Sequence, residues 1–104
     1  MSKILKLMPD YQCFPIWKAG HEIGNVDPDD LPLPDALKVA LRAWAAAYDA
    51  TLNQEHPPDS GFASVAEEEE FEAEGRRLWR ELQVQLRPEY QIVYHSPREG
   101  KLFE

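Results

Sequence analysis

Apolar residues recur with a helical period in two long stretches of the chain. In the first stretch, large side chains are spaced by four, three, four and four residues, at Leu37, Leu41, Trp44, Tyr48 and Leu52. This spacing puts them on one face of a helix with about 3.6 residues per turn. A proline fits the first helical position, so we expect this helix to begin near Pro34 and to fade near Asn53.

The second stretch repeats the same spacing, at Phe71, Gly75, Leu78, Leu82 and Leu86. Ser64 precedes it, and Glu67 follows three residues later, which is the pattern of a capping box. In this motif the serine oxygen accepts the amide proton of Glu67, and the glutamate reaches back to the amide of Ser64. Pro88 should end the helix, because it disfavours helical geometry at Arg87. Gly75 costs about 1 kcal/mol relative to alanine there, so we expect a close backbone approach.

Six glutamates crowd the first turns of this second helix. They suit its positive end, and Glu72 can form an i,i+4 ion pair with Arg76. The helical period turns Phe71 and Gly75 inward. It leaves four acids facing water, with Glu70 at the border: Glu68, Glu69, Glu70 and Glu72.

Alternation of apolar and polar residues predicts strands near both ends of the chain. KILKLM at 3–8 and EYQIVYH at 89–95 alternate with period two, and His95 is expected on the exposed face of its strand. FPIW at 14–17 is a candidate second strand, which Pro15 would confine to an edge or a bend. The segments at 20–34 and 54–62 are rich in glycine and proline, so we expect loops.

This order of elements predicts an α+β fold. Two antiparallel amphipathic helices would pack on one face of a small sheet, which the N- and C-terminal strands form as neighbours. The length of 104 residues suits a single small globular domain over residues 1–104. Residues 96–104 are a candidate flexible tail.

The acids are concentrated in the middle of the chain. Residues 22–74 contain fourteen acids and two bases, a net charge of −12, whereas the other residues have five acids and nine bases, a net charge of +4. The two parts together give the formal net charge of −8. So acidic a chain opposes the approach of nucleic-acid phosphates and favours a basic protein partner. Solubility alone is the alternative explanation of the acids.

The sequence contains no recognisable catalytic, metal or cofactor motif. His21 and Glu22 are adjacent, but the second histidine of H-E-x-x-H is missing. The acids at 27–30 lack the glycine and the closing glutamate of a calcium loop. No histidine stands at zinc-ligand spacing from Cys13, which is the lone cysteine. We therefore predict no enzyme, no cofactor and no metal.

The start of the chain contains only a short apolar stretch. Lys6 interrupts it and Pro9 ends it, so it is too short for a signal sequence or a membrane span. A lone thiol at Cys13 fits a reducing compartment. We expect a cytoplasmic protein that does not contact a membrane.

Segments spread over nearly the whole chain resemble one known family. They are MPDYQCFPIW at 8–17, GNVDPDDLPLP at 24–34, AWAAAYDATLN at 43–53, SGF at 60–62 with the glutamate run, and EGRRLW at 74–79. The family consists of short acidic bacterial proteins without an assigned activity, and some members resemble the immunity proteins of polymorphic toxin systems. Ile16 and Pro34 stand where leucine and serine are common. The resemblance carries no catalytic motif and implies a protein-binding role.

The leading hypothesis is therefore an immunity or antitoxin-like protein that neutralises a basic bacterial toxin through an acidic surface. Trp17 suits either the core or the anchor of a partner. The predicted contact residues are Trp17, Asp27, Asp29, Asp30, Asp59, Glu67, Glu68, Glu69 and Glu70. The alternatives are a non-enzymatic structural module, monomeric or homodimeric, and an enzyme assembled from scattered residues.

Overall fold

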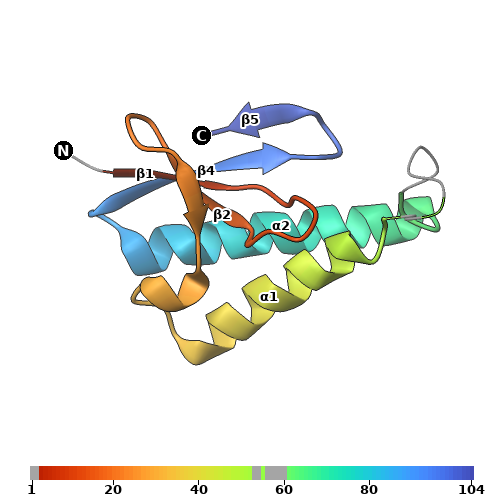
Figure 1. Cartoon of the computed structure of the whole chain (residues 1–104), viewed down its shortest axis with the longest axis horizontal. Helices are drawn as coiled ribbons and strands as arrows, with labels where there is room; N and C mark the ends of the chain where they lie inside the picture. Colours follow the sequence, from red (N-terminus) through yellow and green to blue (C-terminus); the bar gives the residue numbers. More distant parts are fainter. Residues whose placement is uncertain (1–2, 53–54, 56–60) are drawn as a thin grey trace.

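The computed structural model describes residues 3–52, residue 55 and residues 61–104. These residues form two long helices and five strands, with one turn of 3₁₀-helix before the first long helix (Figure 1). In chain order these are β1 (Lys3–Leu7), β2 (Ile16–Ala19), β3 (Gly24–Val26), η1 (Pro28–Asp30), α1 (Asp35–Asp49), α2 (Val65–Leu86), β4 (Tyr90–Ser96) and β5 (Lys101–Phe103). The α+β class predicted from the sequence is confirmed.

The strands form one mixed sheet in the order β3-β2-β1-β4-β5. β1 and β4 lie side by side at its centre and run parallel, and the other neighbours are antiparallel. The expected pairing of the two terminal strands is therefore confirmed. Leu5 lies opposite Ile92 and Leu7 opposite Tyr94, so these four side chains share one face.

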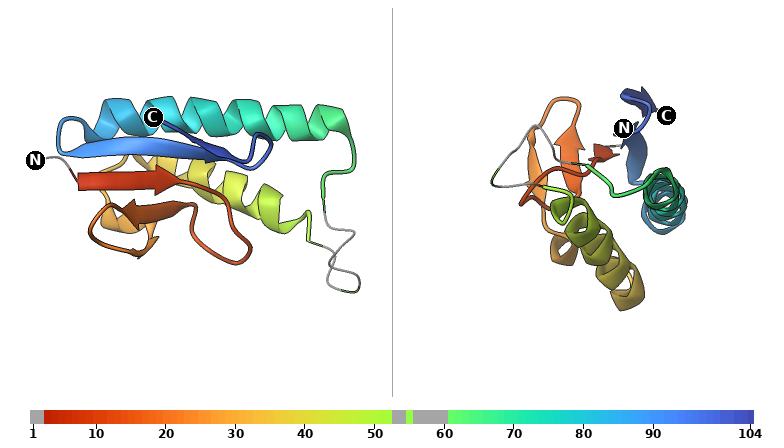
Figure 2. Two further views of the ribbon diagram at one scale, coloured as in Figure 1. Left: turned by 90° about the horizontal axis from the view of Figure 1, so that it is seen from above. Right: turned by 90° about the vertical axis from the view of Figure 1, so that its right-hand side faces the viewer.

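Both long helices lie on this face of the sheet (Figure 2). The core forms between the sheet and the apolar faces of the helices, and the predicted helical positions are buried as expected, at Leu37, Leu41, Trp44, Phe71, Gly75, Leu78, Leu82 and Leu86. Tyr48 and Trp79 pack against the same core while remaining partly exposed. Full burial of one such side chain contributes about 1.5–3 kcal/mol, so these two faces dominate the favourable side of folding.

The chain runs in opposite senses along the two helices, but α1 is inclined to α2 and diverges from it away from their connection (Figure 1). Close antiparallel packing along their whole length is therefore not confirmed. α1 also ends earlier than expected, at Asp49, with Ala50 as its C-cap. α2 ends at Leu86, before Pro88, as predicted.

Three short elements differ from the sequence-based expectation. The predicted loop at 20–34 contains β3 and η1, and the C-terminal segment contains β5. The second strand begins at Ile16 and lies between β1 and β3; of the two places expected for Pro15, an edge or a bend, the structure has the bend. Pro15 does not disturb the ladder, because it precedes the first residue of the strand.

The N-terminus of α2 carries half of the predicted capping box. The Ser64 side chain accepts the amide proton of Glu67, with an oxygen–nitrogen distance of 3.1 Å. The Glu67 carboxylate accepts from the amide of Ala63, one residue before the cap, at 3.2 Å. The reciprocal bond therefore reaches Ala63 in place of Ser64, so the serine satisfies an unpaired amide of the first helical turn and the glutamate fixes the residue before the cap.

None of the helices in the described part of the chain combines the length and the apolar character needed to cross a membrane.

Candidate partner-binding surface

A groove of about 550 Å³ lies between the C-terminal half of α1 and the N-terminal half of α2. On the α1 side its wall is a stripe of small residues, Ala43, Ala47 and Ala50, which recur on one helical face. Phe62 precedes α2 and also lines the groove. The alanine-rich stretch that favours helix formation in α1 thus leaves room beside the backbone.

The floor of this groove is aromatic. The rings of Trp44 and Phe71 stack with their centroids 4.6 Å apart, and the Trp44 Nε1–H donates to the Phe71 carbonyl at 3.0 Å. Phe62 lies 5.0 Å from Phe71, measured between ring centroids. Because Trp44 and Phe71 are buried and their contacts fix them, the floor is rigid and apolar.

Three acids of α2 form the opposite rim of the groove: Glu67, Glu70 and Glu74. Glu67 accepts from Ala63, and Glu74 forms an ion pair with Arg77 at 2.6 Å. Glu70 is exposed and makes no hydrogen bond or ion pair within the described residues. Its charge is therefore available to a partner.

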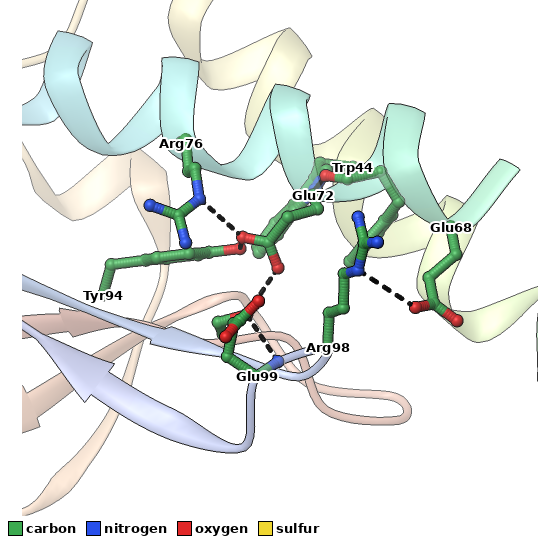
Figure 3. A network of polar contacts seen from close by, with 9 residues as sticks. Trp44, Glu68, Glu72, Arg76, Tyr94, Arg98 and Glu99 are labelled. Atoms are coloured by element: carbon green, nitrogen blue, oxygen red, sulfur yellow. Dashed lines mark hydrogen bonds and ion pairs between the residues drawn. The ribbon is translucent and has the colours of Figure 1, made fainter. Parts of the chain in front are cut away.

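Glu68 and Glu69 point to a different side of α2. Both approach the guanidinium of Arg98 in the turn between β4 and β5, at 3.5 and 3.7 Å respectively. Figure 3 shows the Glu68–Arg98 pair beside the sheet. The positive charge of Arg98 therefore partly offsets the negative charge of these two acids. Neither acid lines the groove.

The acids around η1 form a second, separate cluster. Asp27 caps η1 by accepting from the amide of Asp29 at 2.9 Å. The guanidinium of Arg42 lies 3.1 Å from Asp27 and 2.9 Å from Asp29, and Lys38 lies 3.8 Å from Asp29. Asp30 is exposed.

The structure does not bring the predicted acids together into one face. η1 and the start of α2 lie at opposite ends of a molecule 43 Å long (Figure 1). Asp59, the remaining acid of the prediction, lies outside the described residues.

Trp17 lies on the face of the sheet that points away from the helices, because it pairs with Lys6 rather than with a core-facing residue. It is half-buried, and its Nε1–H donates to the carbonyl of Met8 at 2.9 Å. It does not belong to the core cluster, so its interpretation as a core residue is wrong.

Glu72 is the residue that sequence reasoning misplaced most clearly. It was expected to face water, but only 7% of it is exposed. Its carboxylate accepts from the Tyr94 hydroxyl at 3.0 Å, from the Ser96 hydroxyl at 2.5 Å and from Arg76 Nε at 3.0 Å (Figure 3). The predicted ion pair with Arg76 is confirmed, but it closes a buried network that joins α2 to β4.

This network changes the chemistry of Tyr94. Burial and the adjacent Glu72 carboxylate raise the pKa of the Tyr94 hydroxyl well above its usual value of 10.0. The hydroxyl is therefore a fixed hydrogen-bond donor at neutral pH. The donors and the acceptor satisfy one another within the network, which indicates a structural role for these residues.

His95 was expected on the exposed face of its strand. The ring is half-buried on the outward side of β4, opposite Leu102, and its Nδ1 has no hydrogen-bond partner in the part of the chain that the structure describes. Among the described residues, no group of histidine, cysteine and acidic side chains is arranged to hold a metal ion.

A family described as "Serratia CdiI immunity protein-like" matches residues 3–97, which is nearly the whole chain. No curated protein matches the chain.

Proposed function

The chain belongs to the Serratia CdiI immunity protein-like family, and from this premise we propose that it binds and neutralises a basic toxin through the groove between α1 and α2. The observation that carries the proposal is the combination of an apolar floor with an acidic rim that includes the unpaired Glu70. Such a site fits a toxin segment that presents apolar side chains together with lysine or arginine.

The floor and the rim have different tasks in this proposal. Burial of apolar side chains against Trp44, Phe62 and Phe71 supplies most of the affinity. The rim acids steer a basic partner during encounter and fix its orientation, which affects the association rate more than the affinity. Neutralisation then follows if the bound chain covers the toxin's own functional surface.

The remaining predicted contact residues take lesser places in this proposal. Glu68 and Glu69 belong to α2, the helix that carries the acidic rim, but they lie outside the groove. They add to the negative field around it, although Arg98 offsets part of their charge. The Asp27, Asp29 and Asp30 cluster lies at the far end, and fields from exposed charges fade over about 8 Å at physiological salt. We therefore assign that cluster no part in the same contact. The proposed place of action is the cytoplasm, where a toxin that enters the cell would meet the protein.

A charge reversal at the rim tests the proposal. The purified chain is mixed with a candidate toxin domain, sought in the open reading frame directly upstream of the chain's gene, and the association rate is measured at several salt concentrations. We expect Glu70→Lys to slow association roughly three- to tenfold and to flatten its dependence on salt. The matched control is Asp30→Lys, which makes the same charge change at the other end of the molecule and should leave the rate nearly unchanged.

Co-expression separates the function from the site. If the unmodified chain gives no protection against growth arrest by that toxin domain, the proposed function is wrong. If the chain protects, but Asp30→Lys slows association and Glu70→Lys does not, the function stands and the groove is the wrong surface.

A further inference from the structure

The groove between α1 and α2 has helices for both of its long walls. The amides and carbonyls in the interior of a helix bond to one another, so such a wall offers a partner side chains rather than backbone groups. The first turn of α2 is satisfied as well, because Ser64 accepts from the amide of Glu67 through its hydroxyl and from the amide of Glu68 through its carbonyl. In the described part of the groove, a partner segment therefore finds little free backbone with which to pair.

The polar side chains of the floor and of the α1 wall are also engaged. The indole N–H of Trp44 donates to the carbonyl of Phe71, and the hydroxyl of Thr51 donates to the carbonyl of Tyr48 at 2.6 Å. An extended segment lying on this surface would bury amides and carbonyls against apolar side chains without partners, which opposes binding. A helix avoids this cost, because its own backbone groups are satisfied internally.

The length of the groove favours a helical occupant for a second reason. Ala43 and Ala50 both line it, and the seven-residue step between them corresponds to a rise of about 10 Å. An extended segment covers that length with about three residues, of which only one or two turn toward the floor. A helix covers it with about seven residues and directs about three apolar side chains inward. The helix thus brings more apolar surface to Trp44 and Phe71 over the same length.

The alanines of α1 allow a helix to come close. Ala43, Ala47 and Ala50 are exposed and follow one another at spacings of four and three, so they form a smooth stripe along one face of α1. The axes of packed helices lie about 8–10 Å apart, depending on the side chains at the contact, and small side chains permit the shorter distances. A further helix can therefore lie against α1 and reach the aromatic floor.

The acidic rim has helical spacing as well. Glu67, Glu70 and Glu74 are three and four residues apart, so they lie along one edge of α2. Basic residues with the same spacing on a helix lying alongside would meet these acids in turn. On an extended segment the matching residues would be two apart, because two strand residues span about the same 6 Å as four helical ones.

We propose that the toxin segment that enters the groove is an amphipathic α-helix, with lysine or arginine residues three or four positions apart beside its apolar face. This inference rests on the proposed toxin binding and adds the form and the charge pattern of the bound segment. The mode is that of a helix laid into an apolar groove, which residues at helical spacing anchor. Two helices of this chain and one of the partner then share the aromatic floor.

Paired charge reversals measure the spacing of the partner's basic residues. Glu70→Lys and Glu74→Lys are each prepared in the full chain. Each is tested against variants of the candidate toxin domain in which one lysine or arginine at a time is changed to glutamate. A toxin variant that raises the slowed association rate at least threefold identifies the residue that faces that rim position. We expect the residues that face Glu70 and Glu74 to be three or four positions apart in the toxin sequence.

Glu81→Lys is the matched control, because Glu81 is an exposed acid of the same helix outside the groove. It should leave the association rate nearly unchanged, and circular dichroism checks that each variant is folded. Facing residues two positions apart, facing residues in separate segments of the toxin, or no restoring residue at all would overturn the helical occupant while leaving the groove as the binding site. If neither rim variant slows association, the groove itself is wrong, and this inference falls with it.

Discussion

At the scale of single residues, Glu72 is the side chain with the most consequences for stability. A buried carboxylate costs free energy unless it is paired and hydrogen-bonded. Here Tyr94, Ser96 and Arg76 together meet that requirement. The Ser96 hydroxyl also accepts the amide proton of Glu99, so the carboxylate holds the turn into β5 as well as α2 and β4.

Replacement of Glu72 by alanine should therefore destabilise the protein by about 3 kcal/mol, because it leaves buried donors without an acceptor. Urea denaturation measures the change in the free energy of unfolding. Glu69→Ala is the control, since its side chain is largely exposed and should change stability by no more than about 0.5 kcal/mol. Equal effects of the two substitutions would show that the Glu72 network contributes nothing specific.

Tyr94 makes stability depend on pH in the alkaline range. Its folded-state pKa is raised, so the folded protein holds the phenolic proton more tightly than the unfolded chain does. The stability that this linkage contributes is present below the unfolded pKa of about 10 and is lost as pH rises through the folded pKa. Unfolding of the unmodified chain and of Tyr94→Phe should be compared at pH 8 and pH 11. The variant should lose less stability between the two, and parallel losses would contradict the assignment.

At the scale of elements, α2 depends on the absence of a side chain at Gly75. A Cβ atom at this position would lie 2.7 Å from Trp44 Cζ2 and 2.7 Å from the Tyr94 hydroxyl oxygen. The glycine thus lets the helix approach α1 and β4 at the point where the aromatic floor and the Glu72 network meet. This explains why a residue that weakens helices stands in the middle of the longest one.

Gly75→Ala should destabilise the protein by about 1 kcal/mol. Overpacking against Trp44 and Tyr94 costs about 1–3 kcal/mol, and the gain in helix propensity of about 1 kcal/mol offsets only part of it. Ala73→Gly, at an exposed position of the same helix, should also destabilise, by about 1 kcal/mol. Thermal or urea unfolding measures both variants. A stabilised Gly75→Ala variant would show that the close approach relaxes at no cost.

The helices could be predicted from the sequence because their apolar residues keep a regular period over several turns. The short strands could not. β3 has three residues, and β5 is equally short. Neither is long enough to establish an alternating pattern, and each is defined by the neighbour with which it pairs. Glu72 was expected to face water because an i,i+4 pair with Arg76 is the usual pattern of an exposed helix surface. The residues that bury and bind its carboxylate, Tyr94 and Ser96, belong to β4, so the helical period alone could not indicate them.

At the scale of the whole molecule, the distribution of charge along the chain differs from its distribution in space. The sequence places fourteen acids between residues 22 and 74 and therefore favours one acidic face. The fold separates these acids, because the length of α1 lies between η1 and the start of α2 (Figure 1). Arg42 and Arg98, which are remote in sequence from the acids that they neutralise, reduce both clusters further. Only the three-dimensional arrangement shows that Glu70 remains unpaired beside an apolar groove.

The parallel pairing of β1 with β4 also has a consequence for synthesis. β1 is the first strand to be synthesised and lies at the centre of the sheet. Its neighbour β4 is the fourth of the five described strands, so it is synthesised much later. At about 5–20 residues per second, a ribosome needs roughly 5–20 s to reach β4 after it has made β1. During this delay Leu5 and Leu7 lack the strand that helps to bury them. A chain still on the ribosome therefore cannot yet close its sheet, and the face on which both long helices pack is complete only after β4 has been made.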